Sequence, residues 1–132
     1  MERKIYNNLL NWKEKNINLP YMLVGARQTG KTYILTEFCK NEFPNFVYIN
    51  LENMTELTKI FEETLEPKKI ISAIEIYLGI TINVKDTIIF FDEIQTSERA
   101  INSLKYFSEA DEEYKIVCAG SLLGVKINRF KS

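Results

Sequence analysis

The chain has 132 residues, of which 45% are hydrophobic and 27% charged, and its formal net charge is −1. This length suits one domain with a real core, and the near-neutral charge implies no strong overall attraction to nucleic acid or anionic membranes. The sequence contains no histidine, which excludes a histidine-based catalytic triad or a histidine-containing metal site within it.

The spacing of apolar residues divides the chain into alternating helices and strands. In chain order, the patterns predict a helix over 2–14, a strand over 21–25 buried on both faces, a helix from Thr29 towards Pro44, a strand over 46–52, a helix starting near Thr55, a helix from Pro67 to Gly79, a strand over 87–91, a helix capped by Thr96 or Ser97, and a strand over 114–121. Strands that alternate with helices pair in parallel and are covered on both faces. We therefore expect an α/β fold, a three-layer sandwich with a mostly parallel sheet, as a single domain over 1–132.

Two features indicate the cellular compartment. Cys39 and Cys118 lie far apart in apolar surroundings, so we expect buried thiols in a reducing compartment. The amino-terminal residues lack the continuous apolar core of a signal peptide, and no apolar run approaches the ~20 residues that a membrane span needs. The prediction is a cytoplasmic protein without a membrane segment.

In open parallel sheets, ligands bind outside the carboxyl ends of the strands. The first such position is "GARQTGKT", residues 25–32, which matches G-x-x-x-x-G-K-[ST]. Its glycines let the backbone turn around an anion, and the loop leads into a helix N-terminus, which favours phosphate. Lys31 can reach the β- and γ-phosphates of a nucleotide, and the Thr32 hydroxyl can ligate Mg²⁺. The predicted cofactor-binding residues are Gly25, Ala26, Arg27, Gln28, Thr29, Gly30, Lys31, Thr32 and Tyr33. Arg27 could touch phosphate or face solvent.

An acidic pair follows the apolar strand over 87–91. A carboxylate at this position, Asp92, can hold the Mg²⁺ that bridges the β- and γ-phosphates. The next residue, Glu93, can orient or polarise a water molecule for attack on the γ-phosphate. A magnesium carboxylate followed by a water-orienting glutamate favours hydrolysis over phosphoryl transfer to a second substrate. The predicted metal ligands are Thr32 and Asp92.

Two further strand ends carry polar residues with open roles. Ser121 could hydrogen-bond the γ-phosphate or the attacking water, or be a simple turn residue. Asn50 could hydrogen-bond Glu93 and restrain it until a partner binds, or be an ordinary strand-end asparagine. The predicted catalytic residues are Glu93, Lys31, Ser121 and Asn50.

These motifs, in this order, resemble those of the AAA+ ATPases. "GARQTGKT" corresponds to Walker A, "IIFFDE" to Walker B and "CAGS" to the sensor 1 position. More narrowly, "LVGARQTGKT", "YINLE", "FFDEIQ" and "AGSLLG" look like a prokaryotic AAA-type ATPase family whose members typically carry a further C-terminal domain of unknown function.

The resemblance implies a RecA-like P-loop NTPase sheet with strand order 5-1-4-3-2, ATP and Mg²⁺ as cofactors, and a role for Asn50 like that of the family's glutamate switch. Such proteins usually continue into a fifth strand, a helical lid and an arginine finger that acts on a neighbour. The chain stops about ten residues after the sensor position, so we expect a sheet truncated before the lid, slow turnover, and a finger supplied by self-association or a partner protein. Without the fifth strand, the strand over 21–25 is expected to be a hydrophobic edge.

Other functions are compatible with parts of the pattern. The chain could be a nucleotide-dependent interaction module with little turnover, or a small-molecule P-loop kinase. The "LLNW" segment of the first helix could cap the nucleotide base or pack on the sheet. A nucleic-acid partner is not indicated, because the only basic cluster, Lys126, Arg129 and Lys131, is explained by a solvated tail.

Overall fold

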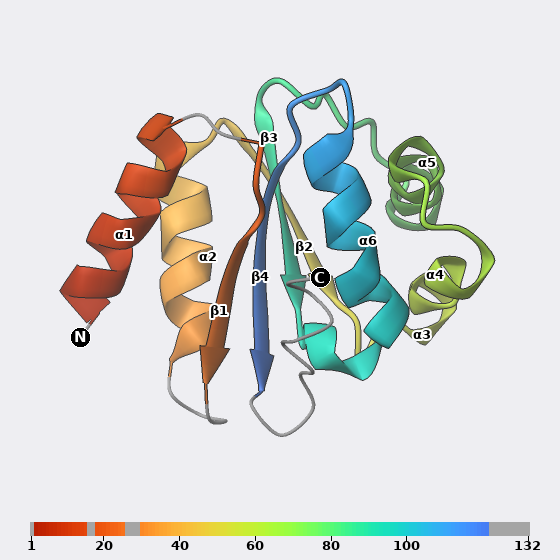
Figure 1. The fold of residues 1–132 in the computed structure, drawn as a ribbon, viewed down its shortest axis with the longest axis horizontal. Coiled ribbons are helices and arrows are strands. Elements are labelled where there is room, and N and C mark those ends of the chain that lie inside the picture. The colour runs from red at the N-terminus through yellow and green to blue at the C-terminus, as the bar shows by residue number, and fades with distance from the viewer. Residues whose placement is uncertain (1, 16–17, 26–29, 122–132) are drawn as a thin grey trace.

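A computed structural model describes residues 2–15, 18–25 and 30–121 (Figure 1). Its elements, in chain order, are α1 (Glu2–Lys15), β1 (Tyr21–Gly25), α2 (Lys31–Glu42), β2 (Asn45–Asn50), α3 (Thr55–Thr58), α4 (Ile60–Glu63), α5 (Pro67–Leu78), β3 (Thr87–Asp92), the 3-10 helix η1 (Ile94–Thr96), α6 (Glu98–Glu109) and β4 (Lys115–Ser121). The order of helices and strands follows the pattern predicted from the sequence, except around residues 55–65. The basic cluster near the end of the chain lies outside the described residues.

The four strands form one parallel sheet in the order β1-β4-β3-β2. This order agrees with the 1-4-3-2 portion of the sheet that the family resemblance implies, and it confirms a RecA-like P-loop NTPase fold. Within the described sheet β1 lies at one edge, and its five residues are half-buried. The prediction of a strand buried on both faces is wrong for β1, because at the edge of the described sheet all five of its residues stay partly exposed to solvent.

Alternation along the two central strands builds a separate core on each face of the sheet. One face of β3 and β4 presents residues such as Phe91 and Cys118 to α5 and α6, and the other presents residues such as Phe90 and Val117 to α1 and α2. Figure 1 shows the three resulting layers, with α1 and α2 on one side and α5 and α6 on the other. The buried polar residues in these layers are few, so both cores are predominantly apolar.

Local signals explain where the helices begin and end. Pro67 opens α5 at a position where a proline is tolerated, and Gly79 ends it with a φ of 68°. Ser97 caps α6, since its hydroxyl oxygen accepts a 3.0 Å hydrogen bond from the backbone N–H of Ala100. These three boundaries confirm the sequence predictions. The helix predicted from Thr55 is instead two short helices, α3 and α4.

The first helix packs against the sheet and α2, and its tryptophan is part of that packing. Leu9 and Trp12 are buried against α2, and the Trp12 indole N–H donates a 2.6 Å hydrogen bond to the carbonyl of Leu19. The Trp12 ring also contacts Tyr21, the first residue of β1. Trp12 therefore lies at the amino end of the strands, opposite to their carboxyl ends.

Both cysteines are buried free thiols, as predicted. Burial raises the pKa of the Cys39 thiol to about 12 and raises that of Cys118 as well. Neither thiol is activated as a nucleophile by these surroundings. Among the described helices, none combines the length and apolar character needed to cross a membrane.

Candidate nucleotide site

The carboxyl ends of all four strands carry the residues that the sequence analysis selected. Gly25, Asn50, Asp92 and Ser121 are the last residues of β1, β2, β3 and β4. Gly25 pairs with Ser121 in the register of β1 and β4, and Asn50 pairs with Asp92 in the register of β2 and β3. The fold therefore gathers these four positions at one edge of the sheet, where open parallel sheets bind ligands.

The described part of the glycine-rich segment leads directly into α2. Gly30 has a φ of 81°, a left-handed conformation that non-glycine residues rarely adopt, and its carbonyl accepts a 3.1 Å hydrogen bond from the N–H of Ile34. The Lys31 ammonium lies 3.3 Å from the carbonyl oxygen of Gly25, to which it donates a hydrogen bond. The Tyr33 side chain is 63% exposed. Four predicted residues of the segment, Ala26, Arg27, Gln28 and Thr29, lie outside the described residues.

Asp92 is the centre of a hydrogen-bond network. The residue is 3% exposed, and its Oδ2 atom accepts hydrogen bonds from the Thr32 hydroxyl at 2.8 Å and the Tyr48 hydroxyl at 2.6 Å. Its Oδ1 atom accepts the N–H of Glu93 at 2.9 Å. The two predicted metal ligands, Thr32 and Asp92, thus come together although they are far apart in the sequence. A hydroxyl beside a carboxylate fits Mg²⁺, which binds hard oxygen ligands and is usually held by one or two carboxylates together with phosphates and water.

Sequence reasoning did not select Tyr48. Burial, and next its hydrogen bond to Asp92, raise the pKa of the Tyr48 hydroxyl, which therefore stays protonated and donates to the carboxylate. The ring packs edge-on against Phe90, with centroids 5.2 Å apart. The alternation of side chains along β2 could have identified Tyr48, because it lies two residues before Asn50 and so faces the same side of the sheet.

Glu93 directly follows β3 and has an unusual backbone. It is the only non-glycine residue with a positive φ in the described parts of the chain, at φ 54° and ψ 45°, and it caps η1. Such a conformation costs of order 1–3 kcal/mol and persists only where the surroundings enforce it. The Glu93 Oε1 atom accepts a 2.8 Å hydrogen bond from the side-chain N–H of Gln95.

Of the two roles considered for Asn50, a hydrogen bond to Glu93 or an ordinary strand-end asparagine, the structure shows the second. Its Oδ1 atom accepts the backbone N–H groups of Glu52 and Asn53, at 2.9 and 3.1 Å, and its Nδ2 atom donates to the Tyr48 hydroxyl at 3.4 Å. Within residues 30–121, no hydrogen bond joins Asn50 to Glu93. The physical reason is local, because an asparagine at a strand end readily bonds to the backbone of the turn that follows.

Ser121 lies at the end of β4 with its side chain buried. Its backbone N–H donates a 3.0 Å hydrogen bond to the Oε1 atom of Gln95. The same amide therefore contacts both Glu93 and Ser121, which the sequence analysis had not anticipated. "DEIQ" is part of the family resemblance, but its glutamine carried no assigned role.

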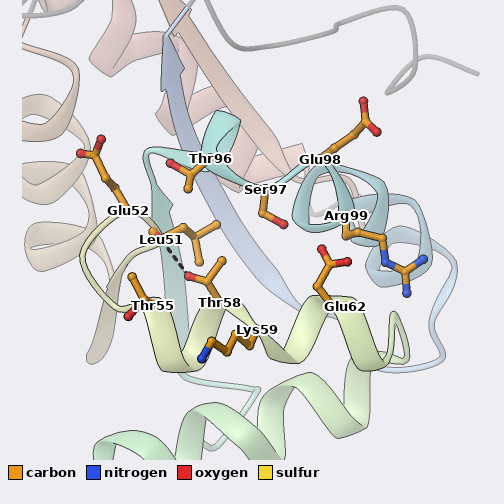
Figure 2. A pocket seen from close by; sticks show the side chains of 10 residues that line it. All are labelled: Leu51, Glu52, Thr55, Thr58, Lys59, Glu62, Thr96, Ser97, Glu98 and Arg99. Atoms are coloured by element: carbon orange, nitrogen blue, oxygen red, sulfur yellow. Dashed lines mark hydrogen bonds between the residues drawn. The ribbon is translucent and has the colours of Figure 1, made fainter.

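A pocket of about 590 Å³ lies beside η1 (Figure 2). Its walls come from the turn after β2, from α3 and α4, and from the start of α6. The lining residues are Leu51, Glu52, Thr55, Thr58, Lys59, Glu62, Thr96, Ser97, Glu98 and Arg99. Thr58 closes one wall by donating a 2.7 Å hydrogen bond to the carbonyl of Leu51, which Figure 2 marks with a dashed line. Thr96 belongs to the same short helix that Glu93 caps, so the pocket and the candidate site share η1.

Comparison with known proteins places the chain among proteins of this fold. The pattern of the family described as "AAA domain" matches residues 18–131. A search of curated proteins finds no match. Among solved structures, a chain in the structure of Drosophila ORC bound to DNA is similar, with a TM-score of 0.55 and 15% sequence identity. The alignment covers 92% of this chain and 38% of the ORC chain, so this chain spans well under half the length of that relative.

At 15% identity the likeness to ORC supports the fold alone. The family match is broader evidence, because it extends over most of the sequence and includes all four strand ends. It also includes the Gly25–Thr32 motif and the Asp92–Glu93 pair. The chain therefore belongs to the AAA domain family.

Proposed function

We propose that this chain binds Mg-ATP at the carboxyl edge of its sheet and hydrolyses it to ADP and phosphate. The observation that carries the proposal is the 2.8 Å hydrogen bond between Thr32 and Asp92. This hydrogen bond joins the start of α2, which follows the glycine-rich segment, to Asp92 at the end of β3. A magnesium nucleotide requires these two halves together, since one binds phosphate and the other binds the metal.

Each residue has a role that its position supports. The N–H groups at the start of α2 and the Lys31 ammonium would bind the β- and γ-phosphates. Thr32 and Asp92 would hold Mg²⁺, which neutralises charge on the bridging phosphate oxygens when bound. Glu93 would orient a water molecule towards the γ-phosphate. The Ser121 hydroxyl would contact the γ-phosphate or that water.

Two parts of the proposal come from the family resemblance. One is the preference for adenine. The other is an arginine finger supplied by self-association or by a partner protein. Such fingers are worth about 10³–10⁵ in rate in related phosphoryl-transfer enzymes, so we expect slow hydrolysis by this chain alone.

A second candidate function is a nucleotide-dependent interaction module with little turnover. The observation that favours it is the pocket that shares η1 with Glu93. A partner seated there would contact Thr96, three residues after the glutamate. In that case nucleotide binding, rather than hydrolysis, would carry the function.

The first test is a calorimetric titration of the chain with ATP and with GTP, each with Mg²⁺. We expect saturable ATP binding that Lys31→Ala removes. The matched control is Lys40→Ala, which removes an exposed lysine from the last turn of the same helix and should bind ATP normally. Normal ATP binding by Lys31→Ala would refute the phosphate-binding role.

Phosphate release then separates the two candidates. Loss of a positioned general base typically costs about 10²–10⁴ in rate, so Glu93→Gln should slow hydrolysis by that factor and leave ATP binding intact. If Glu93→Gln has no effect on phosphate release, or if the parent chain binds ATP and releases none, the hydrolytic proposal fails and the interaction module is favoured.

A further inference from the structure

The side chain of Gln95 is bonded at both of its polar atoms. Its Nε2 atom donates a 2.8 Å hydrogen bond to Oε1 of Glu93, and its Oε1 atom accepts a 3.0 Å hydrogen bond from the backbone N–H of Ser121. One partner directly follows β3, and the other ends β4. Gln95 therefore bridges two strand ends of the candidate site with one amide group.

An amide satisfies both partners of the bridge. A carboxylate can only accept hydrogen bonds and a backbone N–H can only donate one, so the bridging group must offer a donor on one side and an acceptor on the other. This requirement also determines the orientation of the Gln95 amide. A glutamate there would place two carboxylates together, and a lysine would leave the Ser121 N–H without its acceptor.

The bridge extends to the phosphate-binding segment. Ser121 is the register partner of Gly25, whose carbonyl accepts the hydrogen bond from Lys31. The sequence of contacts thus runs from Lys31 through Gly25 and Ser121 to Gln95, and ends at the Glu93 carboxylate. The left-handed backbone of Glu93 is held by hydrogen bonds of its own, since its N–H donates to Oδ1 of Asp92 and its carbonyl accepts the N–H of Thr96. Gln95 adds a contact that fixes the carboxylate.

We propose that Gln95 is a positioning residue, which ties the Glu93 carboxylate to the end of β4 and so makes the placement of Glu93 depend on the phosphate-binding side of the site. This inference rests on the proposed hydrolysis. It assigns to Gln95, rather than to Asn50, the contact that restrains the glutamate. Asn50 is engaged in the turn after β2 and makes no hydrogen bond to Glu93 in the described residues.

Three variants of the purified chain test the proposal. Gln95→Met has a side chain of similar length and loses both hydrogen bonds. Gln95→Lys keeps a donor for Glu93 and loses the acceptor for Ser121. Lys105→Met is the matched control, because Lys105 is an exposed residue of α6 that takes no part in the bridge and does not line the pocket.

The measurements are the Kd for Mg-ATP, the rate of phosphate release at saturating ATP, and amide hydrogen exchange at Ser121. We expect Gln95→Met and Gln95→Lys to lower the rate by about 10–100-fold, as the loss of a positioning contact commonly does. The Kd should change by less than about threefold, since the contact acts on the reacting geometry rather than on ground-state binding. The Ser121 amide should exchange faster in both variants, and Lys105→Met should match the parent chain in all three measurements.

Each contrary result has a distinct meaning. Gln95→Met with the parental rate overturns the positioning role while the proposed hydrolysis stands. If Gln95→Lys releases phosphate at the parental rate while Gln95→Met is slow, the hydrogen bond to the end of β4 is not needed, and that part of the proposal is overturned. A parent chain that binds ATP and hydrolyses none refutes the proposed hydrolysis itself, and the positioning role with it. A large loss of ATP binding in Gln95→Met would show a structural role and also overturn the proposal.

Discussion

Removing one oxygen atom from Tyr48 tests the hydrogen bond that organises Asp92. In Tyr48→Phe the ring keeps its packing against Phe90. The substitution removes the 2.6 Å hydrogen bond to the buried Asp92 carboxylate and the longer, 3.4 Å hydrogen bond that the hydroxyl accepts from Asn50. Hydrogen bonds to charged groups contribute about 1.5–3 kcal/mol to stability, so the free energy of unfolding should fall by that amount. For a chain of this size, the fall corresponds to a decrease in Tm of about 5–15 °C.

The assay is urea unfolding at pH 7, followed by the fluorescence of Trp12, the one tryptophan of the chain. Tyr114→Phe is the matched control, because its buried ring packs on Phe107 and its hydroxyl makes no hydrogen bond in the described part of the chain. Combining Tyr48→Phe with Asp92→Asn completes a double-mutant cycle, and we expect a coupling of about 1 kcal/mol or more. If Tyr48→Phe unfolds within about 0.5 kcal/mol of the parent chain, the hydrogen bond adds no net stability and the reasoning is refuted.

Two further predictions concern backbone conformation and pH. Gly30→Ala forces a left-handed alanine at the start of α2, which should cost about 1–2 kcal/mol of stability and weaken ATP binding in the calorimetric titration. Gly79→Ala imposes similar strain in open space away from the site, so it should lose stability and keep ATP binding; equal binding losses in both variants would contradict the assignment. Cys39→Ala should change the pH dependence of stability. The native Cys39 thiol stays protonated up to about pH 12 while the unfolded thiol ionises near 9.0, so the free energy of unfolding falls as pH rises between these values. The variant should lack this contribution, about 1.4 kcal/mol per pH unit, in urea unfolding between pH 10 and 11. If the free energy of unfolding has the same slope against pH in the variant and the parent chain, this prediction is contradicted.

The fold was largely predictable because apolar runs and turn residues agree along most of the chain. The exception shows what such patterns miss. Leu57, Ile60 and Phe61 indicate one helical face, yet the helix breaks at Lys59. The carbonyl of Phe61 accepts a 2.8 Å hydrogen bond from Arg99, which lies on α6. The residues around Lys59 do not predict this break, because the contact that accompanies it involves a residue far away in the sequence.

The candidate site was predictable only where a motif specifies the residue. Thr32 and Asp92 belong to recognisable motifs, and the structure brings them together. Tyr48 and Gln95 depend on the register of neighbouring strands, because each bonds to a residue in another segment. For Asn50, the sequence reasoning weighed a long-range partner, whereas the turn that follows offered a nearer one.

The position of β4 between β1 and β3 has a consequence for folding during synthesis. Tyr21 of β1 pairs with Val117 of β4, so β1 gains its neighbour in the described sheet only after nearly a hundred further residues have been made. At about 5–20 residues per second, β1 waits roughly 5–20 s on the ribosome. Pairings this distant in sequence also make folding slow once the chain is released. During that interval the apolar strand needs protection from other nascent chains, and the nucleotide site is among the last parts of the molecule to form.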